Sequence, residues 1–142
     1  MARPATETVH WNEEMVLLVQ RVAAQCEVRF NRALKPLNLT WQQFVVLKVL
    51  NAAGNPLAVK DLQQHMPASS CNLSRLVDKL TDRKLIVRKT SGKDRRQLEI
   101  SLTAGGKSIY SAASAMVQTV ISEIPPVPLD RFEWLDEWES AF

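Results

Sequence analysis

The sequence is poor in the residues that build covalent cross-links, metal sites and catalytic centres. Its 142 residues include only two cysteines, two histidines and four glycines. Cys26 and Cys71 form neither a metal-ligand spacing nor a disulfide framework, which predicts a reducing compartment. His10 and His65 lie far apart, and the chain has no glycine-rich phosphate loop or nucleophile motif. We therefore expect no metal, no cofactor and no enzyme activity.

Long hydrophobic runs are also missing. No apolar run approaches the roughly 18 residues that span a bilayer, and the N-terminus lacks a signal-peptide core. Hydrophobic residues still make up 46% of the chain, which is enough for a core. These features predict a soluble, cytoplasmic protein that makes no use of a membrane.

The net charge of +3 conceals a strong segregation of charge along the chain. From Lys60 to Lys107 there are eleven Lys/Arg and five Asp/Glu, whereas Gln118 to Phe142 has one Arg and six acids. The central segment therefore has an excess of about +6 and the C-terminal one of about −5. Basic surface predicts affinity for polyanions but not sequence recognition, and a charged face can also be merely solvated.

The basic segment has the periodicity of a helix followed by a hairpin. Apolar residues recur at i, i+3, i+4 and i+7 over about Ser69 to Asp82: Leu73, Leu76, Val77 and Leu80. The opposite face is polar and cationic. Strands are predicted at 85–90 and 97–102, joined by a turn-rich loop with three cations. A short helix at 59–66 completes a helix-turn-helix with the wing beside it.

The helices outside this segment begin and end at clear signals. Thr40 and Gln43 predict a capping box, with Leu39 and Phe44 as the accompanying hydrophobic staple, and Gly54 predicts the helix stop. The helix between them is expected to bury Phe44, Val45, Leu47 and Leu50. Thr103 is placed to cap a helix that continues to about residue 124.

The two ends of the chain predict dimerisation helices. Residues 8–34 lack Gly and Pro and carry an apolar seam that includes Val16 and Val19. Residues 129–142 place Trp134, Leu135 and Trp138 on one face. This last segment can fold back on its own domain, but we favour packing of both ends across a homodimer. The predicted fold is mainly α with a small β-hairpin wing: a dimerisation helix (1–36), a winged helix-turn-helix (37–103) and C-terminal dimerisation helices (104–142).

Several motifs, taken in order, resemble the MarR (multiple antibiotic resistance regulator) family. They are Leu39-Thr40 with Gln43 and Leu47, Leu73-Ser74-Arg75-Leu76-Val77-Asp78-Lys79-Leu80, Leu85-Ile86-Val87-Arg88, Asp94-Arg95-Arg96, and Ser101-Leu102-Thr103 with Gly106. The resemblance covers about residues 12 to 124. It implies a dimeric transcriptional regulator, usually a repressor, that binds pseudo-palindromic operators and is often released by small ligands or oxidation. Lys84 departs from the family, which usually has Gly there.

Position and resemblance together predict the residues that contact double-stranded DNA. They are Ser69, Ser70, Asn72, Arg75 and Lys79 on the helix, and Lys93, Arg95 and Arg96 on the wing. Ser69 is expected to be the N-cap of the recognition helix. The resemblance implies that Asp94 orients Arg75 or Arg95.

The effector is less constrained by the sequence. The resemblance implies a ligand pocket beside Trp41 and Phe44, although aromatic residues at helical spacing are also ordinary core. Cys71, expected in the first turn of the recognition helix, is a candidate redox switch, but both cysteines can equally be small apolar fillers. The competing function is a protein-interaction module whose basic wing binds an acidic partner. Preference for one duplex over a scrambled one would separate the two functions.

Overall fold

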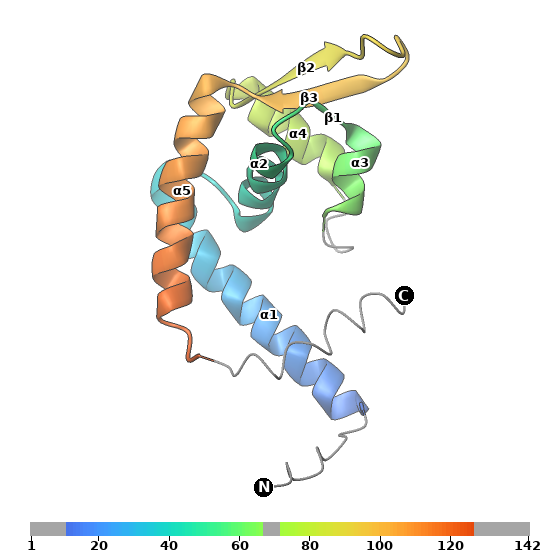
Figure 1. The fold of residues 1–142 in the computed structure, drawn as a ribbon. Helices are drawn as coiled ribbons and strands as arrows, with labels where there is room; N and C mark the ends of the chain where they lie inside the picture. The colour runs from blue at the N-terminus through green and yellow to red at the C-terminus, as the bar shows by residue number, and fades with distance from the viewer. Residues whose placement is uncertain (1–10, 67–71, 127–142) are drawn as a thin grey trace, which may run out of the picture.

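The computed structural model describes residues 11–66 and 72–126, which form a mainly helical fold with one small sheet (Figure 1). In chain order its elements are α1 (Glu13–Leu34), the 3-10 helix η1 (Lys35–Leu37), α2 (Trp41–Ala53), β1 (Leu57–Ala58), α3 (Val59–Gln64), α4 (Leu73–Asp82), β2 (Ile86–Thr90), β3 (Leu98–Leu102) and α5 (Ala104–Ser122). The predicted fold class, mainly α with a hairpin wing, is confirmed. Among the described helices, none has the length and apolar character needed to cross a membrane.

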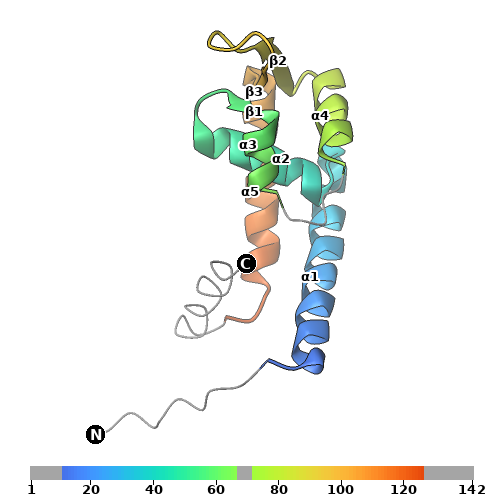
Figure 2. The same cartoon turned by 90° about the vertical axis from the view of Figure 1, so that its right-hand side faces the viewer.

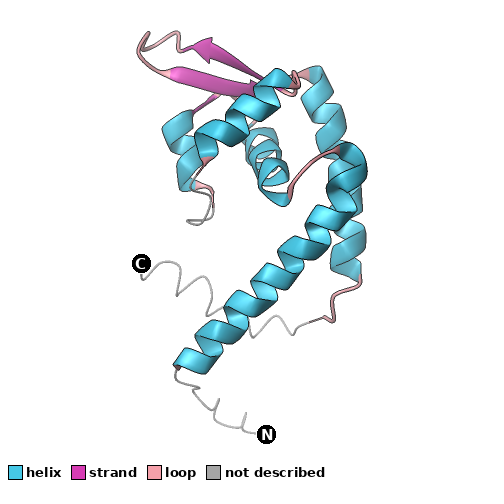
Figure 3. Cartoon of the chain, turned by 180° about the vertical axis from the view of Figure 1, so that it is seen from behind, coloured by secondary structure: helices cyan, strands magenta, loops and turns pink. Residues whose placement is uncertain are grey.

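The sheet has three antiparallel strands in the order β1-β3-β2 and lies at one end of the molecule (Figure 3). β2 and β3 pair from Ile86↔Leu102 to Thr90↔Leu98, so the predicted hairpin is confirmed. Each strand begins one residue later than predicted. The third strand, β1, was not predicted, because its two residues carry no periodicity and depend on pairing with β3.

The helices α2, α3 and α4 pack their apolar faces under the sheet. In α4, Leu73, Val77 and Leu80 are buried and Leu76 is half-buried, which confirms the predicted stripe. Side chains from the other elements complete this core: Phe44, Val46, Leu47, Leu50, Leu62, Ile86 and Ile100. The prediction was wrong about Val45, which is only half-buried. The buried residues 43, 46, 47 and 50 follow the i, i+3, i+4, i+7 spacing, and Val45 lies beside that stripe.

Local caps fix where α2 and α5 begin. The Gln43 backbone N–H donates to Thr40 Oγ1 at 3.2 Å, and the Thr40 N–H donates to Gln43 Oε1 at 3.0 Å, as the capping box predicts. Gly54 ends α2 with φ +65°, again as predicted. Thr103 Oγ1 accepts the Gly106 N–H at 2.9 Å and caps α5. These local signals are the most accurately predicted features of the fold.

The helix α1 extends away from the winged domain beside α5 (Figure 2). Its C-terminal end is anchored by the buried residues Phe30 and Leu34, and it is followed by η1, which contains Pro36. Towards its N-terminus the helix exposes an apolar surface made of Val16, Leu17, Leu18, Val19 and Val22. Between 39% and 57% of each of these side chains is exposed, which is unusual for contiguous large apolar residues on a monomer.

Candidate nucleic-acid interface

The outer face of α4 carries the polar side chains predicted to read a duplex. Ser74, Arg75 and Lys79 are all exposed, on the side of the helix opposite the buried Leu73 and Val77. The strong separation of apolar and polar faces lets α4 pack into the core while a cationic surface faces solvent. The predicted placement of Arg75 and Lys79 on one accessible helical face therefore agrees with the geometry.

The beginning of this helix differs from the prediction. α4 begins at Leu73, and Asn72 occupies the N-cap position with φ −122° and ψ 42°, without a side-chain capping hydrogen bond. The helix thus begins four residues after the predicted start at Ser69, because the backbone of Asn72 is not helical. Asn72 itself is exposed beside the first turn. Ser69, Ser70 and Cys71, which were predicted at the start of this helix, lie outside the described residues.

The tip of the wing is shaped by hydrogen bonds between short side chains and the backbone. Ser91 Oγ, in a buried residue, accepts from the N–H groups of Lys93 at 3.2 Å and Asp94 at 3.4 Å. Asp94 Oδ1 accepts the Arg96 N–H at 2.9 Å, and the Asp94 carbonyl accepts the Gln97 N–H at 3.0 Å. Asp is favoured at the first position of such a turn for this reason. The turn leaves the side chains of Lys93, Arg95 and Arg96 exposed at the tip.

Asp94 therefore shapes the wing turn. The resemblance implied that it orients Arg75 or Arg95, but among the described residues its carboxylate forms no ion pair with either arginine. Its effect is on the backbone that carries Arg95 and Arg96.

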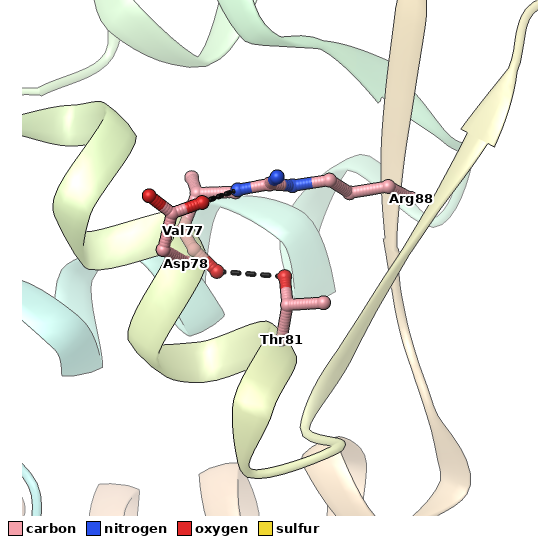
Figure 4. A network of polar contacts seen from close by, with 4 residues as sticks. All are labelled: Val77, Asp78, Thr81 and Arg88. Atoms are coloured by element: carbon pink, nitrogen blue, oxygen red, sulfur yellow. Dashed lines mark hydrogen bonds and ion pairs between the residues drawn. The ribbon is translucent and has the colours of Figure 1, made fainter.

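A different acid–arginine pair joins α4 to the wing. The Arg88 guanidinium on β2 donates to the Asp78 carboxylate on α4 (Figure 4). The sheet register places Arg88 opposite Ile100, on the same face of the hairpin as the buried Ile86, and this face packs against α4. Both residues stand in the quoted motifs, yet no role was predicted for either. The sequence did contain a signal for this contact. Ile86 and Arg88 are two residues apart in β2, so both side chains lie on the same face of the strand, towards α4.

The junction of α4, β2 and α5 is tightly packed. Lys84 adopts the left-handed conformation with φ 57°, at the position where the resembled family usually has Gly. Thr103 Oγ1 donates towards the carbonyls of Lys84 at 2.7 Å and Leu85 at 3.1 Å. A Cβ on Gly106 would lie 1.9 Å from the Leu85 carbonyl oxygen, so only glycine fits there without a backbone shift. This junction fixes the base of the wing against the N-terminus of α5.

The aromatic residues considered for a ligand pocket stack on one another. Ring centroids are 4.3 Å apart for Phe30 and Trp41, 5.5 Å for Trp41 and Phe44, and 5.7 Å for Phe44 and Tyr110. This row connects α1, α2 and α5 and buries Phe44 almost completely. Trp41 and Phe44 thus contribute to packing, and their role in binding a ligand stays a prediction.

The remaining predicted residues were those expected at a dimer interface. Val16 and Val19 are exposed on α1, as a partner-facing seam requires. Trp134, Leu135 and Trp138 lie outside the described residues. Within residues 11–66 and 72–126, the His, Cys, Asp and Glu side chains form no cluster that could hold a metal ion.

The central part of the chain is similar to a known family. A family model described as MarR family matches residues 37–97, from the last residue of η1 to the residue before β3. The chain is 29% identical over 107 residues to an HTH-type transcriptional repressor of Mycobacterium tuberculosis, covering 75% of this chain and 76% of the relative.

Solved structures share the fold. A putative MarR-like transcription regulator from Bacillus cereus aligns with a TM-score of 0.78 at 15% identity, covering 92% of this chain and 97% of the other. A mutant MarR from E. coli complexed with operator DNA aligns with a TM-score of 0.71 at 22% identity, covering 88% and 92%. The motifs, the winged helix-turn-helix fold and these matches agree, and the chain is similar to the MarR family over the matched region.

Proposed function

We propose that the protein regulates transcription by binding double-stranded DNA. The observation that carries this proposal is a pair of exposed cationic surfaces, on α4 and on the wing tip, joined by the Asp78–Arg88 ion pair. A recognition helix of about 10 residues fits the major groove, while a basic wing can reach an adjacent minor groove. The match to the MarR family model and the structurally similar MarR mutant complexed with operator DNA support the same conclusion.

The contacts follow from the position and chemistry of each side chain. Asn72 and Arg75, at the start of α4, suit base edges, because amides pair well with adenine and guanidinium groups with guanine. Lys79 and Lys93 suit phosphates, which fix the position of a protein on DNA without reading sequence. Arg95 and Arg96 suit a narrow, A/T-rich minor groove, whose negative potential attracts arginine. Ser69 and Ser70 precede α4 in the chain and stay predicted contacts.

The protein is further proposed to act as a homodimer. The exposed apolar surface of α1 supports this, because a second copy could cover it. A two-fold pair of recognition helices would bind half-sites about 34 Å apart, which corresponds to a pseudo-palindromic operator.

The protein is proposed to repress, and not to activate, transcription from its target promoter. Support comes from the relative in Mycobacterium tuberculosis, which is named a transcriptional repressor. Release by a small ligand or by oxidation stays a prediction from the family resemblance, since Trp41 and Phe44 pack against each other and Cys71 is outside the described residues. A promoter–reporter fusion should be less active when the protein is expressed and should recover when it is removed.

The DNA-binding proposal can be tested on the DNA upstream of the gene that encodes the protein. Fluorescence anisotropy should show a preference of about 10³ or more over a scrambled duplex of equal length. Replacing both wing arginines, Arg95→Ala with Arg96→Ala, should weaken operator binding by about tenfold or more, because two groove contacts are lost.

The matched control removes the same charge from elsewhere in the domain. Lys35 and Lys48 are exposed outside α4 and the wing, so Lys35→Ala with Lys48→Ala should leave operator affinity within about threefold. Equal losses in the two double variants would show that net charge, and not the wing, governs binding. Equal binding of the wild type to operator and scrambled DNA, tested with several promoter fragments, would favour the protein-interaction function.

A further inference from the structure

We infer that Arg83 is a positioning residue for DNA recognition, which holds the C-terminal end of α4 against the junction between α1 and α2. The inference rests on the proposed function, because it assumes that α4 reads DNA. It adds a residue that acts on the direction of the helix without touching the duplex.

The contacts of Arg83 bridge parts of the chain that are far apart in sequence. Its Nη1 donates to the Asn38 carbonyl at 2.6 Å, and its Nη2 donates to the Leu37 carbonyl at 2.9 Å. Both terminal nitrogens of the guanidinium are thus engaged with backbone acceptors. The planar fork of arginine suits two neighbouring acceptors, whereas a lysine ammonium is a single point charge that cannot reproduce this geometry.

The two carbonyls that accept these hydrogen bonds lie in a turn that is itself held by backbone hydrogen bonds. Asn38 is left-handed with φ 54°, and its N–H donates to the Lys35 carbonyl at 2.9 Å. The Leu39 N–H donates to the Leu34 carbonyl at 3.3 Å, and both of these side chains are buried. The two carbonyls that receive Arg83 are therefore fixed to the end of α1 and to the residues just before α2.

The donor is equally well placed on α4. Arg83 occupies the C-cap, where its backbone N–H donates to the Lys79 carbonyl at 3.2 Å, and Lys84 then turns the chain towards β2. Arg88 contacts α4 from the wing, and Arg83 ties the end of the helix to the α1 junction. Because α1 also carries the proposed dimer surface, this second contact connects the direction of α4 to the position of the partner.

The expected consequence is strict spacing between the two half-sites. In a dimer with the contact intact, the distance between the two α4 helices is defined, and an operator with one base pair added or removed binds poorly. If the contact is lost, α4 can shift relative to α1, so the dimer should tolerate altered spacing while losing affinity for the natural operator.

A phosphate contact by Arg83 makes different predictions. Removing a phosphate-binding cation weakens binding to all duplexes alike and reduces the slope of log affinity against log salt by about one. A lysine would largely preserve such a contact. Arg83→Lys therefore separates the two roles, because it keeps the charge and loses the fork.

The experiment measures binding of Arg83→Lys and Arg83→Met to the operator and to versions with one base pair inserted into or deleted from its centre. Wild-type protein should lose about tenfold or more in affinity for either altered duplex. Both variants should bind the natural operator about tenfold more weakly and discriminate among the three duplexes by less than about threefold, with unchanged salt slope. Asn38→Gly keeps both the acceptor carbonyl and the left-handed turn, and it should behave like wild type.

Circular dichroism at the assay temperature shows which variants are folded. If Arg83→Met is unfolded, the result for Arg83→Lys alone decides the test. Wild-type spacing discrimination in folded Arg83→Lys would overturn the inference, whatever its affinity. If instead the wild type binds operator and scrambled DNA equally, the proposed function fails. The inference about Arg83 then fails because there is no specific DNA binding, and not because of the spacing result.

Discussion

At the scale of single residues, Gly106 and Gly54 are required for different physical reasons. A Cβ on Gly106 would meet the Leu85 carbonyl oxygen at 1.9 Å, whereas a Cβ on Gly54 would meet nothing within 4 Å. Gly54 instead adopts φ +65°, which strains any residue with a side chain. One glycine permits a close approach between α5 and the wing, and the other permits a backbone conformation.

This difference predicts unequal effects of alanine. Gly106→Ala should lower the free energy of unfolding by about 2–3 kcal/mol, because the backbone must move apart. Gly54→Ala should lower it by about 1 kcal/mol, the usual strain of a left-handed residue. Urea denaturation followed by circular dichroism measures both. Helix propensity alone would make Gly106→Ala stabilising by about 1 kcal/mol, so a stabilised Gly106→Ala variant would contradict the close approach.

Residues whose roles are local could be predicted from the sequence, and residues with distant partners could not. Thr40 and Gln43 cap each other across three positions, so the pattern alone identified them. Arg83 acts on carbonyls 45 and 46 residues away, and nothing in its local sequence indicates that contact. Lys84 is an intermediate case: the resemblance marked the position, but only the structure gives its left-handed φ of 57°.

At the scale of secondary-structure elements, the Asp78–Arg88 pair is a direct side-chain link between α4 and the wing. The two side chains are 55% and 33% exposed, so solvent screens their attraction. Exposed pairs of this kind contribute between 0 and about 1 kcal/mol to stability. Their larger effect should be on the relative direction of α4 and the wing, the two elements proposed to contact DNA.

A double-mutant cycle with Asp78→Asn and Arg88→Gln tests this expectation. The coupling between the two changes should be below about 1 kcal/mol in urea denaturation, as for other exposed pairs. In operator binding, each single variant should lose affinity and the double variant should lose little more than either, since the same link is broken. Additive losses in binding would mean that the two residues act independently on DNA.

The elements that were predicted correctly have a strong internal periodicity. The stripe of α4 and the alternation in β3 each repeat within one segment, so no distant contact was needed to find them. β1 has only two residues and forms through its pairing with β3, and the start of α4 depends on the backbone at Asn72.

Leu98 continues the apolar alternation of β3 yet is 50% exposed, because it pairs with Thr90 at the end of the hairpin nearest the tip.

At the scale of the whole molecule, the described residues divide into a packed winged domain and two helices that leave it. The winged domain buries its apolar residues around Leu47, Leu62 and Ile100. In α1, by contrast, Phe30 and Leu34 are the buried residues, and the apolar side chains nearer its N-terminus stay exposed. The sequence predicted an apolar seam on α1. This seam is exposed in the single chain, and a partner helix packed against it would bury it.

The proposed homodimer would depend on this apolar surface, so a charge introduced within the surface should separate the subunits. Val19→Glu should convert a dimer into a monomer at micromolar concentration, because a carboxylate buried without a partner is strongly unfavourable. Analytical ultracentrifugation measures the state, and operator affinity should fall in parallel since one subunit contacts only one half-site.

Gln25→Glu supplies the matched control, because it adds the same charge at an exposed polar position of α1. It should remain dimeric, and circular dichroism should show unchanged helix content in both variants. Dimeric Val19→Glu would place the interface elsewhere, whereas a monomeric wild type that still binds its operator with high affinity would remove two-fold symmetry from the mechanism. In that case the spacing effect expected for Arg83 would vanish too, since one recognition helix has no partner to be spaced from.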